Sequence, residues 1–136
     1  MTQALSWIAI VDDDPSVLRA LARLLNTRAL AARTFTSARD FLMALPDGLP
    51  DCLVVDLQMP EMTGLELQHH LIGAGIRIPT VVITAHHELD MRDHCRAAGA
   101  AHFLFKPLQD TLLLAAIEDA KRGRGPPLRD IDDDEP

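Results

Sequence analysis

The sequence predicts one α/β domain built on a doubly wound, five-stranded parallel sheet. Short apolar runs alternate five times along the chain with longer stretches of helical periodicity. Apolar runs of this kind are typical of parallel strands that are buried on both faces of a sheet. Repeated β–α units joined by right-handed crossovers place such strands in one doubly wound sheet. Periodicity by itself does not determine the order of those strands.

The first half of the chain predicts two strand–helix units. Residues 7–11 form the first strand, and Asp14 before Pro15 is typical of a helix N-cap followed by proline at the first helical position. The second strand spans about residues 30–35, and the second helix spans residues 37–45 before a proline–glycine turn. The apolar faces of the two helices consist of Val17, Leu18, Leu21, Leu24 and Leu25 in the first and Phe41, Leu42 and Leu45 in the second.

The second half predicts three more units. The third strand ends at Asp56, and a loop from Pro60 to Gly64 leads into a helix with a leucine face. Gly73 and Gly75 end that helix. The remaining elements are a fourth strand after Pro79, a helix at about residues 88–98 stopped by Gly99, a fifth strand that ends at Lys106 and a final helix at residues 110–122.

Length and composition favour a single cytoplasmic globular domain. The chain has 136 residues, of which 48% are hydrophobic and 24% charged, so it can bury one core. No apolar run approaches the roughly 18 residues that span a bilayer, and no signal peptide is evident. We therefore expect no membrane partner. Cys52 and Cys95 lie on apolar faces, and we expect both to be small core residues in a reducing compartment.

The charge distribution separates a body from a tail. The formal net charge of −7 argues against nucleic-acid binding by this chain alone. Residues 123–136 are rich in glycine and proline and then acidic, and such a composition buries too little apolar surface to order itself. We therefore predict a folded domain at residues 1–122 and a flexible acidic tail at residues 123–136.

Acidic residues follow two of the predicted strands. Asp12 and Asp13 come after the first strand, and Asp56 ends the third. Ligands of open α/β sheets bind at the carboxyl ends of the strands, so these side chains should converge. Two carboxylates ~4 Å apart repel by roughly 4 kcal/mol at an effective dielectric near 20, which a divalent cation relieves. Mg²⁺ suits sparse carboxylate ligation.

The same edge should carry a hydroxyl and an ammonium group. Thr84 ends the fourth predicted strand, and Lys106 ends the fifth. A carboxylate such as Asp56 can attack phosphorus to form an aspartyl phosphate, and Lys106 with the cation would neutralise the phosphoryl charge. Pro107 raises the chance of a cis peptide bond that aims the lysine inward. The alternatives are an ordinary surface lysine and a plain threonine at a strand end.

Five short motifs, in order, resemble the receiver domain of two-component response regulators, over about residues 5–121. They are Val11-Asp12-Asp13-Asp14-Pro15, Val55-Asp56-Leu57-Gln58-Met59-Pro60, Gly64, Ile83-Thr84-Ala85 and Lys106-Pro107. Residues 35–42 and 98–107 are similar to the FixJ-type branch of that family. The resemblance implies the CheY-like variant of the flavodoxin-like fold.

The resemblance also implies a role for each matching residue. Asp56 matches the phosphoacceptor. Asp12 and Asp13 match the acidic pair that holds Mg²⁺, with Asp13 a direct ligand beside Asp56 and the backbone carbonyl of Gln58. Thr84 with Ala85 and Lys106 match the groups that bind the phosphoryl group. Phe103 matches the aromatic residue that switches with phosphorylation.

As a receiver, the chain would take its phosphoryl group from a sensor histidine kinase. Its catalysis would be limited to its own phosphorylation and dephosphorylation. Signalling would pass through the face formed by the helix at residues 88–98, the fifth strand and the last helix, toward a downstream protein or a second copy of the chain. The alternatives are a fragment of a FixJ-type regulator without its DNA-binding domain, a binding-only receiver, and a hydrolase on the same fold.

Two histidine pairs and one polar helix leave alternatives open. His86 and His87 would make a poor metal pair because adjacent side chains point apart, but His86 lies where it could tune the phosphoryl lifetime. His69 and His70 are interpreted as a pair of solvent-exposed side chains. The helix at residues 88–98 is unusually polar, with Arg92, Asp93, His94 and Arg96, and is either a solvated face or an altered partner surface.

Overall fold

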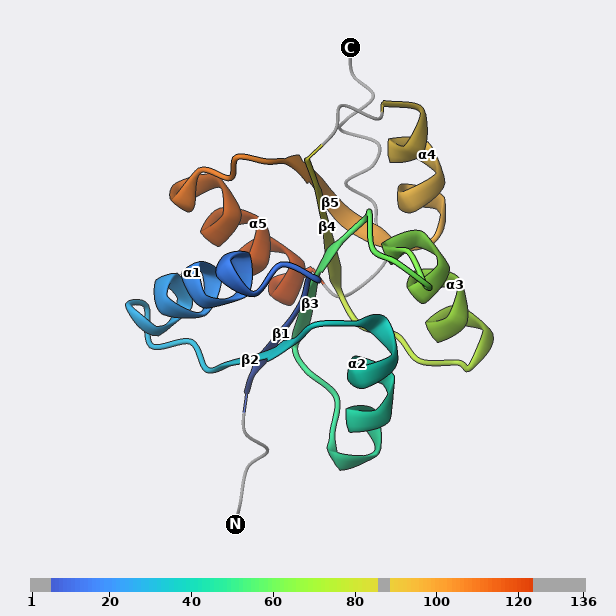
Figure 1. Cartoon of the computed structure of the whole chain (residues 1–136), viewed down its shortest axis with the longest axis horizontal. Helices are drawn as coiled ribbons and strands as arrows, with labels where there is room; N and C mark the ends of the chain where they lie inside the picture. Colours follow the sequence, from blue (N-terminus) through green and yellow to red (C-terminus); the bar gives the residue numbers. More distant parts are fainter. Residues whose placement is uncertain (1–5, 86–88, 124–136) are drawn as a thin grey trace.

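The computed structural model describes residues 6–85 and 89–123, and these form a three-layer α/β domain. Five parallel strands lie in the order β2-β1-β3-β4-β5, as in the flavodoxin-like doubly wound folds. Figure 1 shows α1 and α5 on one side of the sheet and α2, α3 and α4 on the other. The strands are β1 (Ile8–Val11), β2 (Ala32–Phe35), β3 (Cys52–Asp56), β4 (Thr80–Thr84) and β5 (Ala100–Phe105). The helices are α1 (Pro15–Asn26), α2 (Ala38–Ala44), α3 (Gly64–Gly73), α4 (Leu89–Ala97) and α5 (Asp110–Arg122).

The three central strands separate two apolar cores. Every residue of β1, β3 and β4 is buried, as the uninterrupted apolar runs predict. Alternate residues of β1 face opposite layers: Ile8 and Ile10 pack with α1 and α5, whereas Ala9 and Val11 pack with α2, α3 and α4. The sheet is thus held by apolar burial on both faces, which leaves its carboxyl edge available for polar groups.

The fifth strand departs from the prediction of a buried strand. Only Ala100 of β5 is buried, and the other residues of the strand are exposed or partly exposed. The reason is topological, because β5 lies at the edge of the sheet and pairs with β4 alone. The strand begins at Ala100 and pairs with β4 across a register shift between Thr80 and Val81.

Local capping explains where the first two helices begin. The side chain of Asp14 accepts a hydrogen bond from the Ser16 amide at 2.9 Å, which confirms Asp14 as the N-cap of α1. Ser37 caps α2 in the same way, by accepting from the Asp40 amide at 3.1 Å. The predicted proline–glycine turn after α2 is a short 3₁₀-helix, Leu45–Asp47.

The third helix begins earlier than its leucine face indicated. Thr63 is the N-cap, and it forms a capping box in which Glu66 reaches back to the Thr63 amide. Gly64, expected in the loop, is therefore the first helical residue. Its amide donates to the Leu57 carbonyl at 3.0 Å, so α3 starts directly against the chain that leaves β3.

The remaining elements lie close to their predicted positions. The described part of α4 ends at Ala97 before Gly99, whose φ of 101° suits glycine, and α5 covers the predicted residues 110–122. Both cysteines are free and buried, and burial raises the pKa of Cys52 to about 12. His86, His87 and the segment 124–136 lie outside the described residues.

No helix within residues 6–85 and 89–123 combines the length and the apolar character that a bilayer crossing requires.

Gly64→Ala should destabilise the protein by about 2 kcal/mol, because the new Cβ would lie 2.6 Å from the Asp56 carbonyl oxygen and 3.1 Å from the Leu57 Cα. Gly73→Ala in the same helix is the matched control, because a Cβ there meets nothing within 4 Å. We expect that control to be neutral or stabilising by less than about 1 kcal/mol. Urea unfolding at equilibrium measures both, and equal stabilities for the two variants would contradict the close approach.

Candidate functional site

The carboxyl ends of the strands meet at one edge of the sheet, and backbone hydrogen bonds link each to its neighbour. The Asp12 amide donates to the Phe35 carbonyl at 3.1 Å, at the end of β2. The Leu57 amide donates to Ile83 at 2.8 Å, which joins the ends of β3 and β4. The Lys106 amide donates to Thr84 at 2.7 Å, which joins β4 to β5. The residues that directly follow β1, β3 and β5 are thus held in place by backbone hydrogen bonds to the neighbouring strand.

Three carboxylates converge at this edge. The residues are Asp12, Asp13 and Asp56. Each contributes one carboxylate oxygen to a group of three oxygens that all lie within 4.8 Å of one another. Asp12 is fully buried and Asp56 is 4% exposed, whereas Asp13 is exposed. The cluster therefore has two buried members and one that faces the solvent.

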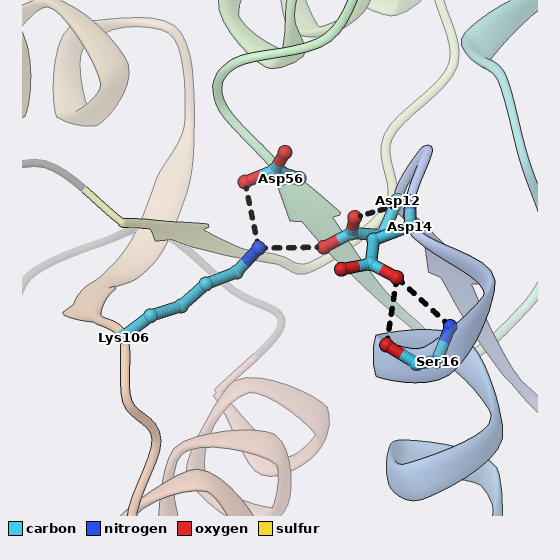
Figure 2. A network of polar contacts seen from close by, with 5 residues as sticks. All are labelled: Asp12, Asp14, Ser16, Asp56 and Lys106. Atoms are coloured by element: carbon cyan, nitrogen blue, oxygen red, sulfur yellow. Dashed lines mark hydrogen bonds and ion pairs between the residues drawn. The ribbon is translucent and has the colours of Figure 1, made fainter.

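Lys106 lies between the two buried carboxylates. Figure 2 shows its side chain reaching across the site, with Nζ 2.8 Å from Asp12 Oδ2 and 3.3 Å from Asp56 Oδ1. The other oxygen of Asp12 accepts a hydrogen bond from the Asp14 amide at 2.9 Å. Asp12 is thus held from both sides and positions the lysine beside Asp56.

The electrostatics of the site act most strongly on Asp56. Burial raises the pKa of Asp56 to about 6, the negative charge of Asp12 adds to the rise, and Lys106 only partly opposes it. For Lys106, burial lowers the pKa, but the hydrogen bond to Asp12 and the charge of Asp56 outweigh it, so the net pKa is raised. Lys106 is therefore a permanent cation at neutral pH, and Asp56 is ionised there against an unfavourable environment.

The donor set fits a divalent cation. Three carboxylates face one lysine, and the buried Oδ1 of Asp56 receives no hydrogen bond from the described residues beyond its ion pair with Lys106. Oxygen ligands of this kind, completed by water, are the ones that Mg²⁺ prefers. Asp12, Asp13 and Asp56 are the residues that would hold such an ion.

The other predicted residues lie on the strands that lead to this centre or in the segments that follow them. Thr84 is fully buried at the end of β4, Ala85 beside it is exposed, and the peptide bond between Lys106 and Pro107 is cis. Gln58 is exposed in the segment between β3 and α3. Phe103 is partly buried on β5, away from the strand end, where it packs against the core and edge-on to Phe105 with ring centroids 5.4 Å apart.

Sequence reasoning missed the roles of two residues of α3 that organise the surroundings of the site. Gly64 was assigned to a loop, although the Thr63-x-x-Glu66 spacing is a readable capping signal. Gln68 drew no attention, yet it is 2% exposed and donates to two backbone carbonyls of the α4 segment. Its position within a leucine-rich helix carries no signal that would identify such a partner.

Fold and site together define a flavodoxin-like α/β domain with an acidic, metal-competent centre at its carboxyl edge. The family model described as the response regulator receiver domain matches residues 8–118. The chain belongs to this family, which acts in two-component signal transduction.

Individual relatives agree with this assignment. The chain is 39% identical over 126 residues to the transcriptional regulatory protein FixJ of Rhizobium meliloti. The aligned region covers 93% of this chain and 62% of FixJ. It is 40% identical to the response regulator protein TmoT of Ectopseudomonas mendocina over 85% of this chain and 52% of TmoT. A crystal structure described as FixJ-N superposes with a TM-score of 0.82 at 38% identity, covering 89% of this chain and 97% of that one. The chain thus spans between half and two thirds of the length of these curated relatives.

The stability of the protein without divalent cations should fall as the pH rises from about 4 to 6. Asp56 has a pKa of about 6 in the folded state against 3.8 as its ordinary value, so in this window the folded protein binds more protons than the unfolded one. The gap of about two pKa units corresponds to roughly 3 kcal/mol. Asp56→Asn should remove this component and be the more stable protein at pH 7 in EDTA.

Urea unfolding of both proteins between pH 4 and 7 measures the difference. Mg²⁺ at millimolar concentration should reduce the difference in stability between Asp56→Asn and the wild type at pH 7, because a divalent cation favours the ionised carboxylates. A wild-type protein whose stability relative to Asp56→Asn does not change across this range would contradict the raised pKa.

Proposed function

We propose that Asp56 accepts a phosphoryl group from a sensor histidine kinase, with Mg²⁺ bound by the acidic cluster. The observation that carries this proposal is the buried carboxylate of Asp56 beside Asp12, Asp13 and Lys106 in a chain of the receiver family. Catalysis is then limited to the chain's own phosphorylation and the hydrolysis that reverses it. We place this reaction in the cytoplasm.

Each residue has a physical task in the transfer. An ionised oxygen of Asp56 attacks phosphorus, the new O–P bond forms, and the P–N bond to the kinase histidine breaks with its electron pair returning to the imidazole. A divalent cation held by Asp12, Asp13 and Asp56 would supply further neutralisation of the phosphoryl charge. Lys106 supplies a second positive charge beside Asp56, and Asp12 holds that lysine in position. The site contributes mainly positioning and charge neutralisation, as phosphoryl transfer requires.

Phosphorylation would then be sensed by the ends of β4 and β5. It adds about −1.5 to −2 charges and three acceptor oxygens at Asp56. Thr84 and Lys106 respond to these oxygens, and they are already joined by the backbone hydrogen bond between their strands. Movement of Thr84 leaves space toward which Phe103 turns. The result is a two-state switch biased by a local change of charge.

The face formed by α4, β5 and α5 is the proposed partner surface. β5 is a partly exposed edge strand, and a hollow of about 320 Å³ between α4 and β5 is lined by Arg92, Arg96, Ala100, Ala101, His102 and Phe103. A second hollow of about 260 Å³ lies on the other side of Phe103, where Phe105, Leu108 and Leu112 line it. Phe103 lines both hollows, so a change in its position alters the face that a downstream protein or a second copy of the chain would contact.

Asp56→Asn should abolish phosphorylation by acetyl phosphate or a phosphorylated sensor kinase in Mg²⁺, since the amide lacks the nucleophilic oxygen. Removal of Mg²⁺ by EDTA should have the same effect on the wild type. Asp14→Asn is the matched control, because Asp14 serves as the α1 cap and asparagine caps equally well. Intact-mass spectrometry checks the 80 Da increment, and its persistence in Asp56→Asn would refute the assignment.

Thr84→Ala should still be phosphorylated on Asp56 but should no longer transmit the change to β5. NMR measures this as the shift of the Phe103 amide on addition of acetyl phosphate and Mg²⁺. Thr34→Ala, an exposed residue of the edge strand β2, is the control and should keep the wild-type shift. A normal Phe103 shift in phosphorylated Thr84→Ala would show that Thr84 does not carry the signal.

A further inference from the structure

Gln68 is a buried polar residue that joins two helices on one face of the sheet. It belongs to α3 and is 2% exposed. Its Nε2 donates to the Cys95 carbonyl at 3.1 Å and to the Ala98 carbonyl at 3.2 Å. Both acceptors lie in the last turn of α4 or directly after it. The amide therefore clamps the C-terminal end of α4 to α3.

The clamp adds hydrogen-bond donors at the end of a helix, where the last carbonyls have few partners. The Cys95 carbonyl also accepts from the Ala98 amide at 3.1 Å, so Gln68 is its second donor, whereas the Ala98 carbonyl lies after the last residue of α4. Gln68 uses its amide N–H groups for this purpose, whereas its Oε1 is buried without a hydrogen-bond partner among the described residues. The opposite amide orientation would set that oxygen against two carbonyls. The side chain is thus oriented by its role as a donor, and leaving Oε1 unpaired is the cost of that orientation.

The other end of α3 is attached to the site. The Gly64 amide donates to the Leu57 carbonyl, and the backbone of Asp56 passes so close that a Cβ on Gly64 would overlap its carbonyl oxygen. Gln68 lies four residues further along the helix, which is about 6 Å at 1.5 Å per residue. A single rigid turn therefore separates the backbone of Asp56 from the clamp.

The clamped end of α4 shapes the hollow on the proposed partner face. Gly99 turns the chain from α4 into β5, and the hollow is lined by Arg96 before this turn and by Ala100 and Ala101 after it. Where α4 ends relative to β5 thus decides the width of that hollow. Gln68 contacts the carbonyl of Ala98, the residue before the turn.

We propose that Gln68 is a positioning residue that couples the phosphorylation site to the α4–β5 hollow through α3. This connection rests on the proposed phosphorylation of Asp56 and runs on the α3–α4 side of the sheet, separate from the route through Thr84 and Phe103. Displacement of the Asp56–Leu57 backbone moves the first turn of α3, and the clamp transfers that movement to the end of α4.

The test uses the full chain with Gln68→Leu, which fills the space but removes the donors. His69→Leu, an exposed neighbour in the same helix, is the matched control. Two buried carbonyls lose a partner in Gln68→Leu, so amide hydrogen exchange at Ala98–Ala101 should accelerate about tenfold or more relative to the control. Phosphorylation of Asp56 by acetyl phosphate in Mg²⁺ should keep its wild-type rate, while the phosphorylation-dependent NMR shifts of Arg96 and Ala101 should be lost.

A second variant separates positioning from simple packing. Gln68→Glu carries no donor when ionised but one O–H donor when protonated, so its protection factors at Ala98–Ala101 should recover as the pH is lowered. Gln68→Leu should show no such recovery. Gln68→Met, with a flexible side chain of similar length, replaces Gln68→Leu if the latter does not fold.

The outcomes distinguish this inference from the proposed function. A wild type that gains no phosphoryl group refutes the proposed function and, with it, the coupling. If Asp56 is phosphorylated and Gln68→Leu keeps the wild-type shifts of Arg96 and Ala101, the coupling is wrong while the phosphoacceptor assignment stands. Faster exchange with unchanged shifts would likewise overturn the coupling, because Gln68 would then only stabilise the end of α4.

Discussion

The arrangement of the site depends on one interaction, the contact of Lys106 with two buried carboxylates. Asp12 and Asp56 repel each other in a poorly solvated site, and Lys106 at 2.8 and 3.3 Å is the cation that permits both to be buried. The compensation is incomplete, since the pKa of Asp56 is still raised to about 6. The carboxylates at this edge of the sheet carry more negative charge than Lys106 neutralises. The remaining negative charge favours the binding of a further cation. The proposed metal binding and the proposed attack of Asp56 on phosphorus would thus both follow from the same charge imbalance.

The parallel sheet tolerates the excess negative charge at its carboxyl edge because the two apolar cores stabilise the strands independently of that edge. Buried apolar residues on both faces of β1, β3 and β4 hold the strands, and the backbone ladder fixes the residues that follow them. Polar groups at the carboxyl edge therefore need not contribute to the core. The sheet has two edge strands, β2 and β5, and the end of β5 leads directly into Lys106. A partly exposed strand, hollowed on both sides of Phe103, suits a surface that changes with a signal.

The helices α3 and α4 give the site a second physical neighbour beside the strand ends. The first residue of α3 touches the Asp56 backbone, and Gln68 holds the end of α4. The proposed coupling through the rigid helix α3 differs from the coupling through the side chain of Phe103. Phe103 needs empty space into which its ring can turn, whereas a helix that moves as a unit does not. Two such connections that converge on one hollow would make the partner face respond to the state of Asp56 as a unit.

The sequence by itself determined the number and kind of elements, since apolar runs and helical faces depend on local burial patterns. It also determined that Asp12, Asp13, Asp56, Thr84 and Lys106 follow strands that end at one edge. Only the tertiary structure decided strand order, and with it the exposure of β5, because pairing partners leave no trace in periodicity. It likewise decided that Lys106 lies nearer to Asp12 than to Asp56, and that Gln68 meets Cys95 and Ala98. These contacts join residues far apart in the chain, so no local pattern encodes them.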